Sequence, residues 1–327
     1  MVDVAKAANV SASTVSLYLR RPSSVATETG STIERAIRDL GYVPNLVAGG
    51  LAAAGSRVVS VIVPSLRNAF FAETVSTIET LLAARGFQTL IGHTEYSPER
   101  EEELVRAALS WSPAGVILTG LEHSEQTRRI LTANRTPVVE MWETGQEPID
   151  VNVGFAHDEI GRMAARHLMA RGRRKLAFLG ARLEEDRRAA QRCEGFRMEC
   201  VDAGLRPAIV THPAPASTES GCILLAQALA ENGLDGIACS NDTVALGVLF
   251  ECQRRGIEVP DAFSLVGFGD LEFSGFCNPS LTTIRPSGEL VARNVASLVL
   301  ARIEEDPAIA PGHVVKIGAS MIVRGSS

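Results

Sequence analysis

From Val58 onward, short apolar runs rich in β-branched residues alternate with longer segments in which apolar residues recur at helical spacing. The runs predict buried strands over Val58–Val63, Phe87–Ile91, Gly115–Thr119, Pro137–Glu140, Lys175–Leu179, Gly236–Cys239 and Phe263–Phe268. The segments between them predict helices over Phe71–Arg85, Pro98–Ser110, Asp158–Arg171, Ala189–Ala203, Ser217–Asn232 and Asp242–Arg255. Such alternation predicts an α/β fold with parallel sheets covered by helices on both faces. Because about 270 residues exceed what one hydrophobic core supports, we expect two α/β lobes.

The first 43 residues carry no strand pattern and predict three short helices. Ser11 is a good N-cap for the second helix, Asn9 tolerates the left-handed backbone of a tight turn, and Gly41 is a good stop for the third. Two short helices joined by such a turn and followed by a third indicate a helix-turn-helix, although a small structural cap fits the pattern equally well. The uncharged, Gly-rich stretch at 44–56 is typical of a linker.

Composition narrows the function classes. The 327 residues are 46% hydrophobic and 21% charged, as in ordinary globular proteins, and no apolar run is long enough to span a bilayer. The N-terminus lacks the apolar core of a signal peptide, and the six cysteines form no CxxC pair, so we expect a cytoplasmic protein with reduced thiols. The net charge of −6 argues against a surface that coats nucleic acid, but not against one small DNA-binding module.

Catalysis finds little support in the residues. The six histidines show no metal-ligand spacing, no nucleophile-elbow motif is present, and Gly267–Gly269 lacks the rest of a dinucleotide-binding fingerprint. We therefore expect no catalytic residues, no metal and no cofactor, and an α/β enzyme remains an unmotivated alternative.

Several spaced motifs resemble the lactose/galactose-repressor (LacI/GalR) family of transcriptional regulators. They are Asp3–Ser16, Leu40–Asn45, Pro64–Glu73, Arg192–Phe196, Ser240–Gly247, Val266–Asp270, Pro279–Arg285 and Arg324–Ser326. Together they cover essentially the whole chain in the family's order. Further segments resemble the gluconate-operon repressors within that family: Leu109–Trp111, Thr136–Trp142, Val153–Phe155, Leu179–Arg182 and Phe250–Arg254.

The resemblance implies a helix-turn-helix headpiece at 1–43, a hinge helix or linker at 44–56 and a two-lobe, periplasmic-binding-protein-like effector and dimerisation domain at 57–327. Lobe 1 would comprise about 57–157 and 286–313, and lobe 2 about 158–285 and 314–327. It also implies a homodimer on a palindromic double-stranded operator, with no membrane partner. We expect a dimer rather than a tetramer because no leucine-repeat tail follows Arg324–Ser326.

In the family, the second helix of the headpiece lies in the major groove, and its early exposed positions read bases. Here those positions hold Ala12, Ser13 and Leu17. The positions that match phosphate contacts, which set register rather than sequence, hold Ser11, Thr14, Ser16, Arg20 and Thr29. The hinge pattern recurs as Asn45, Ala48 and Leu51, and the resemblance implies that Leu51 wedges between base steps in the minor groove. Gly49 and Gly50 each disfavour that helix by about 1 kcal/mol, so we expect it to form only on DNA.

The headpiece also departs from the family. Leu17 stands where arginine is common, and Gly30 where a basic residue is common. Residues 1–56 carry five basic and four acidic side chains, a balance of only +1. A sugar-acid sensor or binding protein with a weak or degenerate headpiece therefore remains the alternative to an operator-binding repressor.

For the effector cleft, Arg192 matches the position whose guanidinium holds the ligand's most polar group, and Arg188 adds positive charge near the same mouth. Asn241 and Asp270 follow apolar strands and are natural hydroxyl partners, although either could simply cap a turn or helix. Trp142 and Phe71, with Asn68 beside the latter, could contact the carbon skeleton, although aromatic residues after strands are often core. An arginine clamp suits a carboxylate or phosphate, so the sequence predicts a sugar-acid effector such as gluconate or 6-phosphogluconate.

Overall fold

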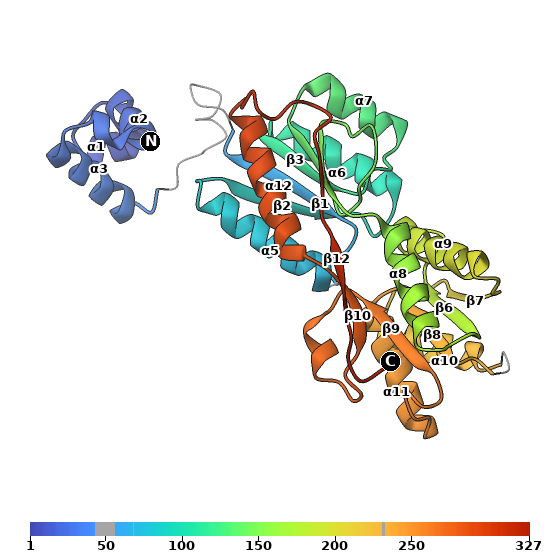
Figure 1. The fold of residues 1–327 in the computed structure, drawn as a ribbon. Helices are drawn as coiled ribbons and strands as arrows, with labels where there is room; N and C mark the ends of the chain where they lie inside the picture. The colour runs from blue at the N-terminus through green and yellow to red at the C-terminus, as the bar shows by residue number, and fades with distance from the viewer. Residues whose placement is uncertain (43–55, 68, 231–232) are drawn as a thin grey trace. The chain divides into compact units, whose positions relative to one another are not determined.

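A computed structural model describes residues 1–42, 56–67, 69–230 and 233–327 (Figure 1). The chain divides into two compact units, residues 1–56 and 57–327. Each unit has its own hydrophobic core, so each is described by itself.

The first unit is the predicted three-helix headpiece, with α1 (Val2–Ala7), α2 (Ala12–Arg20) and α3 (Thr27–Asp39). Val4, Val15 and Ile33, one from each helix, are fully buried against one another. Asn9 takes the predicted left-handed backbone (φ 53°) in the turn between α1 and α2, and Gly41 (φ 58°) follows the end of α3. These local signals confirm the helix-turn-helix geometry.

The second unit contains two six-stranded sheets. In the first the order is β11-β5-β4-β3-β1-β2, built from β1 (Val58–Val63), β2 (Gln88–His93), β3 (Gly115–Thr119), β4 (Val138–Met141), β5 (Val151–Gly154) and β11 (Val314–Lys316). In the second it is β12-β10-β9-β8-β6-β7, built from β6 (Leu176–Ala181), β7 (Ala208–His212), β8 (Gly236–Cys239), β9 (Ser264–Phe268), β10 (Thr282–Pro286) and β12 (Ala319–Ile322). All neighbours run parallel except β12, which is antiparallel to β10.

Helices cover both faces of each sheet. Lobe 1 carries α5 (Ala69–Ala83), α6 (Pro98–Ser110), α7 (Glu125–Asn134) and α12 (Gly288–Ile303); lobe 2 carries α8 (His157–Ala170), α9 (Arg187–Asp202), α10 (Thr218–Ala228) and α11 (Asp242–Arg255). Alternate strand residues face opposite helix pairs. In β1, Val61 packs with the core that includes α5 and α12, whereas Ile62 packs with that of α6 and α7. In β6, Phe178 packs with α8 and α9, and Leu179 with α10 and α11.

One apolar cluster continues from lobe 1 into lobe 2 through aromatic rings. The ring centroids of Trp142 and Phe155 lie 5.6 Å apart, and those of Phe155 and Phe268 lie 6.2 Å apart. Because Trp142 follows β4 of lobe 1 and Phe268 ends β9 of lobe 2, the lobes share a packed contact next to the ends of their strands.

The chain passes from lobe 1 to lobe 2 for the last time at a later residue than the sequence predicts. Residues 314–327 were expected in lobe 2, but β11 pairs with β5 in the sheet of lobe 1, and only β12 pairs with β10 in lobe 2. β11 was misassigned because it consists of two half-buried valines and an exposed lysine, with no pattern that assigns it to either sheet.

Most predicted elements form within two or three residues of their expected ends, while several others were not predicted. β7 was missed because it is an edge strand whose burial alternates, unlike the continuous apolar runs. β5 has only four residues, and α7 is a polar surface helix with few buried side chains. Their assignment needed tertiary contacts.

Candidate functional sites

The start of α2 gathers small hydroxyl side chains in solvent. The Ser11 hydroxyl accepts the Thr14 backbone N–H at 3.1 Å, as an N-cap does, and lies 2.7 Å from the Ser13 hydroxyl. Ser11, Ala12 and Ser13 are exposed, so no described side chain of the headpiece shields this helix end. A helix N-terminus of this kind offers hydroxyl donors and a favourable dipole to a phosphate.

The other predicted DNA-contacting residues are described only in part. Leu17 is 38% exposed, Thr14 and Ser16 are half-buried on α2, and Thr29 is half-buried in the first turn of α3. The Arg20 side chain and the hinge residues Asn45, Ala48 and Leu51 lie outside the described residues. The contacts to DNA stay predictions.

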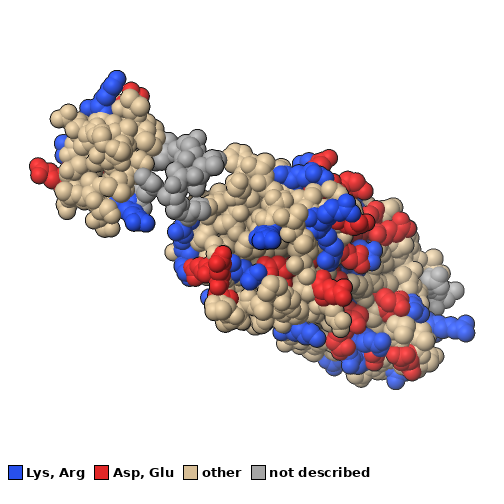
Figure 2. Space-filling model, turned by 90° about the horizontal axis from the view of Figure 1, so that it is seen from above, with Lys and Arg blue, Asp and Glu red and all other residues tan. Residues whose placement is uncertain are grey.

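The glycine that replaces a basic residue has a packing explanation. Gly30 is buried in α3, and a Cβ there would lie 2.8 Å from the Tyr18 ring of α2. The charged side chains of the headpiece are few and mixed in sign, as Figure 2 shows for one face. The headpiece therefore brings little positive charge to a phosphate backbone.

A cavity lies between the lobes of the second unit. Its lining comes from strand ends and helix starts of both lobes: Phe70, Phe71, Trp142, His157, Asp186, Arg188, Arg192, Asn241, Phe268, Gly269 and Leu271. Ligands of parallel α/β folds bind beyond the carboxyl ends of the strands, which is where this cavity lies.

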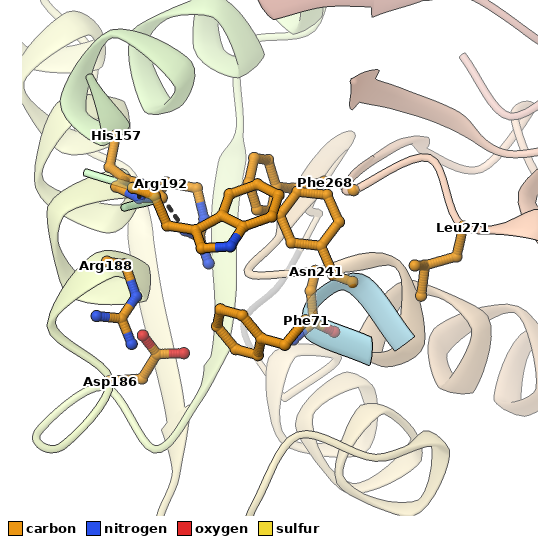
Figure 3. Close-up of a pocket in the computed structure, with 11 residues that line it drawn as sticks. Phe71, His157, Asp186, Arg188, Arg192, Asn241, Phe268 and Leu271 are labelled. Carbon is orange, nitrogen blue, oxygen red and sulfur yellow. Dashed lines mark hydrogen bonds between the residues drawn. The ribbon is translucent and has the colours of Figure 1, made fainter. Parts of the chain in front are cut away.

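Arg192 of α9 forms one wall of the cavity and is only 5% exposed (Figure 3). Its Nε and Nη2 donate to the Ser240 carbonyl at 3.2 and 2.8 Å, and Nη1 donates to His157 Nδ1 at 2.8 Å. The guanidinium carbon also lies 4.1 Å from the centroid of the Phe268 ring. Burial lowers the pKa of Arg192 to about 10, which leaves it charged at neutral pH.

Two more charged groups, both from the start of α9, line the cavity. The Arg188 guanidinium lies 5.9 Å from the Phe71 ring centroid, and no hydrogen bond or ion pair to another described residue holds it. The Asp186 carboxylate caps α9 by accepting the Ala189 N–H at 3.1 Å. With Arg192, the cavity has two cations and one carboxylate, a net charge of +1 if His157 is neutral.

Aromatic rings form the opposite side. The Phe70 and Trp142 centroids lie 4.1 Å apart, and Phe71 meets Trp142 edge-on at 6.1 Å. Trp142 is 1% exposed and Phe71 5%, so both predicted residues serve the core and line the cavity at the same time.

Of the remaining predicted effector residues, one lines the cavity, one does not, and one lies outside the described residues. Asn241 lines the cavity while its Oδ1 caps α11 by accepting the Val244 N–H at 3.0 Å. Asp270 has the left-handed backbone of a strand-end turn (φ 51°), but its carboxylate pairs with Arg285 and, at 2.7 Å, with Arg324 Nη2. It is not among the side chains that line the cavity, so an effector contact by Asp270 stays a prediction that requires these pairs to rearrange. Asn68 lies outside the described residues.

Sequence reasoning missed His157, Asp186 and Phe268. Phe268 lies inside the recognised Val266–Asp270 motif, and Asp186 precedes the predicted helix with Arg192, so position could have identified both. Nothing in the sequence around His157 signals its contact with Arg192, 35 residues away.

Comparisons with known proteins agree with this architecture. The family model of bacterial regulatory proteins of the lacI family matches residues 1–45, and that of a periplasmic binding protein-like domain matches residues 165–327. The HTH-type transcriptional regulator GntR of Pseudomonas aeruginosa is 41% identical over 92% of this chain and 88% of its own length. The chain belongs to the lacI family of bacterial regulatory proteins.

Two solved structures of this family show the same fold. A LacI-family transcriptional regulator from Silicibacter pomeroyi is 33% identical, with a TM-score of 0.92 over 99% of this chain and 98% of that one. The transcription regulator GntR from Chromobacterium violaceum is 37% identical, with a TM-score of 0.78 over 83% of this chain and 99% of that one. As a LacI-family member related to GntR, the chain is a DNA-binding transcriptional regulator and not an enzyme.

The described helices include none long and apolar enough to cross a membrane.

Proposed function

We propose that this LacI-family regulator binds a palindromic operator as a homodimer and is released from it by a sugar acid, gluconate or 6-phosphogluconate, bound in the cavity between its lobes. The observation that supports the effector class best is Arg192. Its charged, buried guanidinium lines the cavity, and its hydrogen bonds to described residues go only to uncharged acceptors, the Ser240 carbonyl and His157.

A buried cation is costly unless an anion compensates it, and guanidinium groups bind carboxylates and phosphates through paired, charge-assisted hydrogen bonds. Asp186 caps a helix in the same cavity, and its carboxylate compensates part of this charge. An anionic ligand would supply further negative charge, and Arg188 at the same wall would add to the attraction. A neutral sugar would leave the net charge of +1 in this lining uncompensated.

The rest of the cavity suits a hydroxylated carbon chain. Asn241 offers an amide for hydroxyl groups, and the rings of Phe71 and Trp142 offer apolar surface for C–H groups. Together with the resemblance to the gluconate-operon repressors, these residues favour a small polyhydroxy acid over a nucleobase or a long apolar ligand.

Calorimetry with gluconate, 6-phosphogluconate and glucose tests the effector class. Replacing Arg192 with Leu should weaken sugar-acid binding by about 2–5 kcal/mol, because the ligand's buried charge loses its partner. Arg187→Leu is the matched control: it removes the same charge five residues earlier on α9, from a side chain that is 64% exposed and pairs with Glu122 outside this cavity. Glucose binding far more tightly than either acid would overturn the assignment.

A dimer on a two-fold operator follows from the weakness of one headpiece. With a net charge of +1 over residues 1–56 and only Ala12, Ser13 and Leu17 at base-reading positions, a single headpiece offers few contacts. Two headpieces related by symmetry double both the positive charge and the number of base contacts. Full affinity for a DNA carrying one half-site would contradict this proposal.

The near-neutral headpiece favours one second candidate, a sugar-acid sensor that no longer recognises DNA. A gel shift with the DNA upstream of its own gene, at low and moderate salt, separates the two. The regulator should form a discrete complex that gluconate or its phosphate dissolves, whereas the sensor should bind the acid and leave this DNA free.

A further inference from the structure

His157 is the first residue of α8, is 4% exposed and forms part of the cavity wall behind Arg192 (Figure 3). One ring nitrogen, Nε2, lies 2.8 Å from the Trp142 carbonyl oxygen, and the other, Nδ1, lies 2.8 Å from Arg192 Nη1. Its ring also meets Phe155 edge-on at 4.7 Å and Phe268 at 6.1 Å. Both polar edges of the imidazole are therefore occupied and its orientation is fixed.

These two partners determine the ring's protonation. A carbonyl oxygen only accepts, so Nε2 must carry a proton and donate to Trp142. A guanidinium only donates, so Nδ1 must present its lone pair to Arg192. Both bonds exist together only in the neutral Nε2–H tautomer. A protonated His157 would direct an N–H toward a cation.

The charges around His157 favour the same neutral form. Burial lowers its pKa well below the ordinary value of 6.5, and the positive charges of Arg192 and Arg188, both on α9, lower it further. The hydrogen bond to the Trp142 carbonyl acts in the opposite direction and is outweighed. The rings packed against it, Phe155 and Phe268, carry no charge.

His157 also determines what Arg192 can offer a ligand. A guanidinium has five N–H groups, and here Nε and Nη2 each direct one to Ser240 while Nη1 directs one to His157. One N–H therefore remains on each terminal nitrogen for a ligand. Without His157, the guanidinium could rotate or use Nη1 elsewhere.

The same residue joins the two lobes. The Trp142 carbonyl belongs to the segment after β4 in lobe 1, where the backbone takes a left-handed conformation (φ 74°), and the Trp142 ring lines the cavity. Arg192 lies on α9 of lobe 2. The two hydrogen bonds of His157 thus connect the Trp142 backbone of lobe 1 to the Arg192 guanidinium of lobe 2, the proposed anion-binding group.

We propose that His157, as a neutral Nε2–H imidazole, is the positioning residue of the effector site: it orients Arg192 toward the ligand's acid group and ties that arginine to the lobe 1 wall. The inference rests on the proposed function, since it concerns the same cavity. It adds a residue and a role that the family resemblance did not supply.

Gluconate titrations of three variants test the role. His157→Leu removes both hydrogen bonds in a side chain of similar reach and should weaken gluconate binding about tenfold or more. His157→Gln can donate to Trp142 through its amide nitrogen and accept from Arg192 through its oxygen, so it should restore most of the lost affinity. His167→Leu, on the same helix but bonded to Ser327, should bind gluconate as the parent does. Equal affinity of parent and His157→Leu, or no recovery with Gln, would refute the role.

Nitrogen-15 NMR of protein labelled at histidine gives a second readout, because it reports the protonation of His157 in the parent protein itself. The His157 signal, assigned by its loss in His157→Gln, should report the neutral Nε2–H tautomer from pH 8 to 6. In Arg192→Leu its Nδ1 resonance should move toward that of a free imine nitrogen, because the donor is gone. A cationic ring or the Nδ1–H tautomer in the parent protein would overturn the inference, even if gluconate is not the effector. Failure of the parent to bind any sugar acid would instead count against the proposed function.

Discussion

At the scale of single residues, the described part of the chain buries charged groups whose pKa depends on their neighbours. Lobe 1 gives a second case besides Arg192: the His123 side chain is fully buried, with Nδ1 2.7 Å from a Glu101 oxygen and Nε2 3.3 Å from a Glu140 oxygen. Burial by itself lowers the pKa of His123, but the two carboxylates outweigh it and raise the pKa to about 9. Glu140 also accepts the Ile149 N–H at 2.6 Å, which holds the loop after β4.

This cluster makes stability depend on pH. Because the folded state binds the His123 proton more tightly than the unfolded state, the stabilisation is complete below pH 6.5 and is lost as pH rises through about 9. We expect the free energy of unfolding to fall by about 2–3 kcal/mol more in the parent than in His123→Gln across this range. Denaturant titrations at several pH values measure it. Parallel curves for the two proteins would show that His123 is neutral in the folded state.

At the scale of elements, α8 and α9 approach so closely that glycine is required at their contact. A Cβ on Gly161 would lie 1.9 Å from the Arg192 carbonyl oxygen, and one on Gly195 would lie 1.9 Å from the Asp158 carbonyl oxygen. The same close approach occurs between α10 and α11, where a Cβ on Gly221 would lie 2.2 Å from the Val244 carbonyl oxygen. Only the first contact involves the backbone that carries Arg192.

Alanine substitutions at these two helix contacts should affect stability alike but effector binding differently. Gly161→Ala should destabilise the second unit by about 1–3 kcal/mol through overpacking and also weaken gluconate binding, because α9 must move away from α8 and take Arg192 with it. Gly221→Ala should destabilise to a similar extent while the folded protein keeps the parent's gluconate affinity. Thermal unfolding and calorimetry distinguish them. Equal losses of affinity in both variants would mean that Arg192 does not depend on this helix contact.

At the scale of the whole molecule, the effector cavity and the predicted DNA contacts belong to different units of the chain. Control must therefore pass through a change in the arrangement of the lobes that both ligands bias. A coupling of about 1–3 kcal/mol changes operator affinity roughly 5–150-fold. We expect the segment 44–56 to transmit it, a prediction on residues of which the structure describes only Ser56.

The predicted hinge offers a direct test of this coupling. Gly49→Ala/Gly50→Ala lowers the cost of a hinge helix by about 2 kcal/mol per chain. The double variant should bind operator more tightly and release it less readily with gluconate, while the effector affinity of the free protein stays nearly unchanged. Fluorescence anisotropy of labelled operator measures both effects, and circular dichroism should show helix gained when the parent binds DNA. A double variant as responsive to gluconate as the parent would refute this mechanism.

The sequence by itself determined what depends on local chemistry. The Ser11 cap and the turn at Asn9 specify the headpiece, and the continuous apolar runs of β1, β3 and β8 specify buried parallel strands, because both signals lie within a few adjacent residues. The spaced motifs also predicted an effector-binding role for Arg192, which lines the cavity. Edge strands, polar surface helices and the membership of β11 were not predictable in this way, since each is defined by its neighbours in space.

Tertiary structure alone decided which side chains act together at the site. The position of Asp270 after a strand predicts a ligand contact, but only the fold shows that Arg285 and Arg324 pair with its carboxylate. His157 looks like an ordinary helix residue until the fold brings the Trp142 carbonyl and Arg192 to its two nitrogens. The sequence gives the charge and length of a side chain, but the packing of the two lobes determines its partners. Those partners then determine its orientation and protonation.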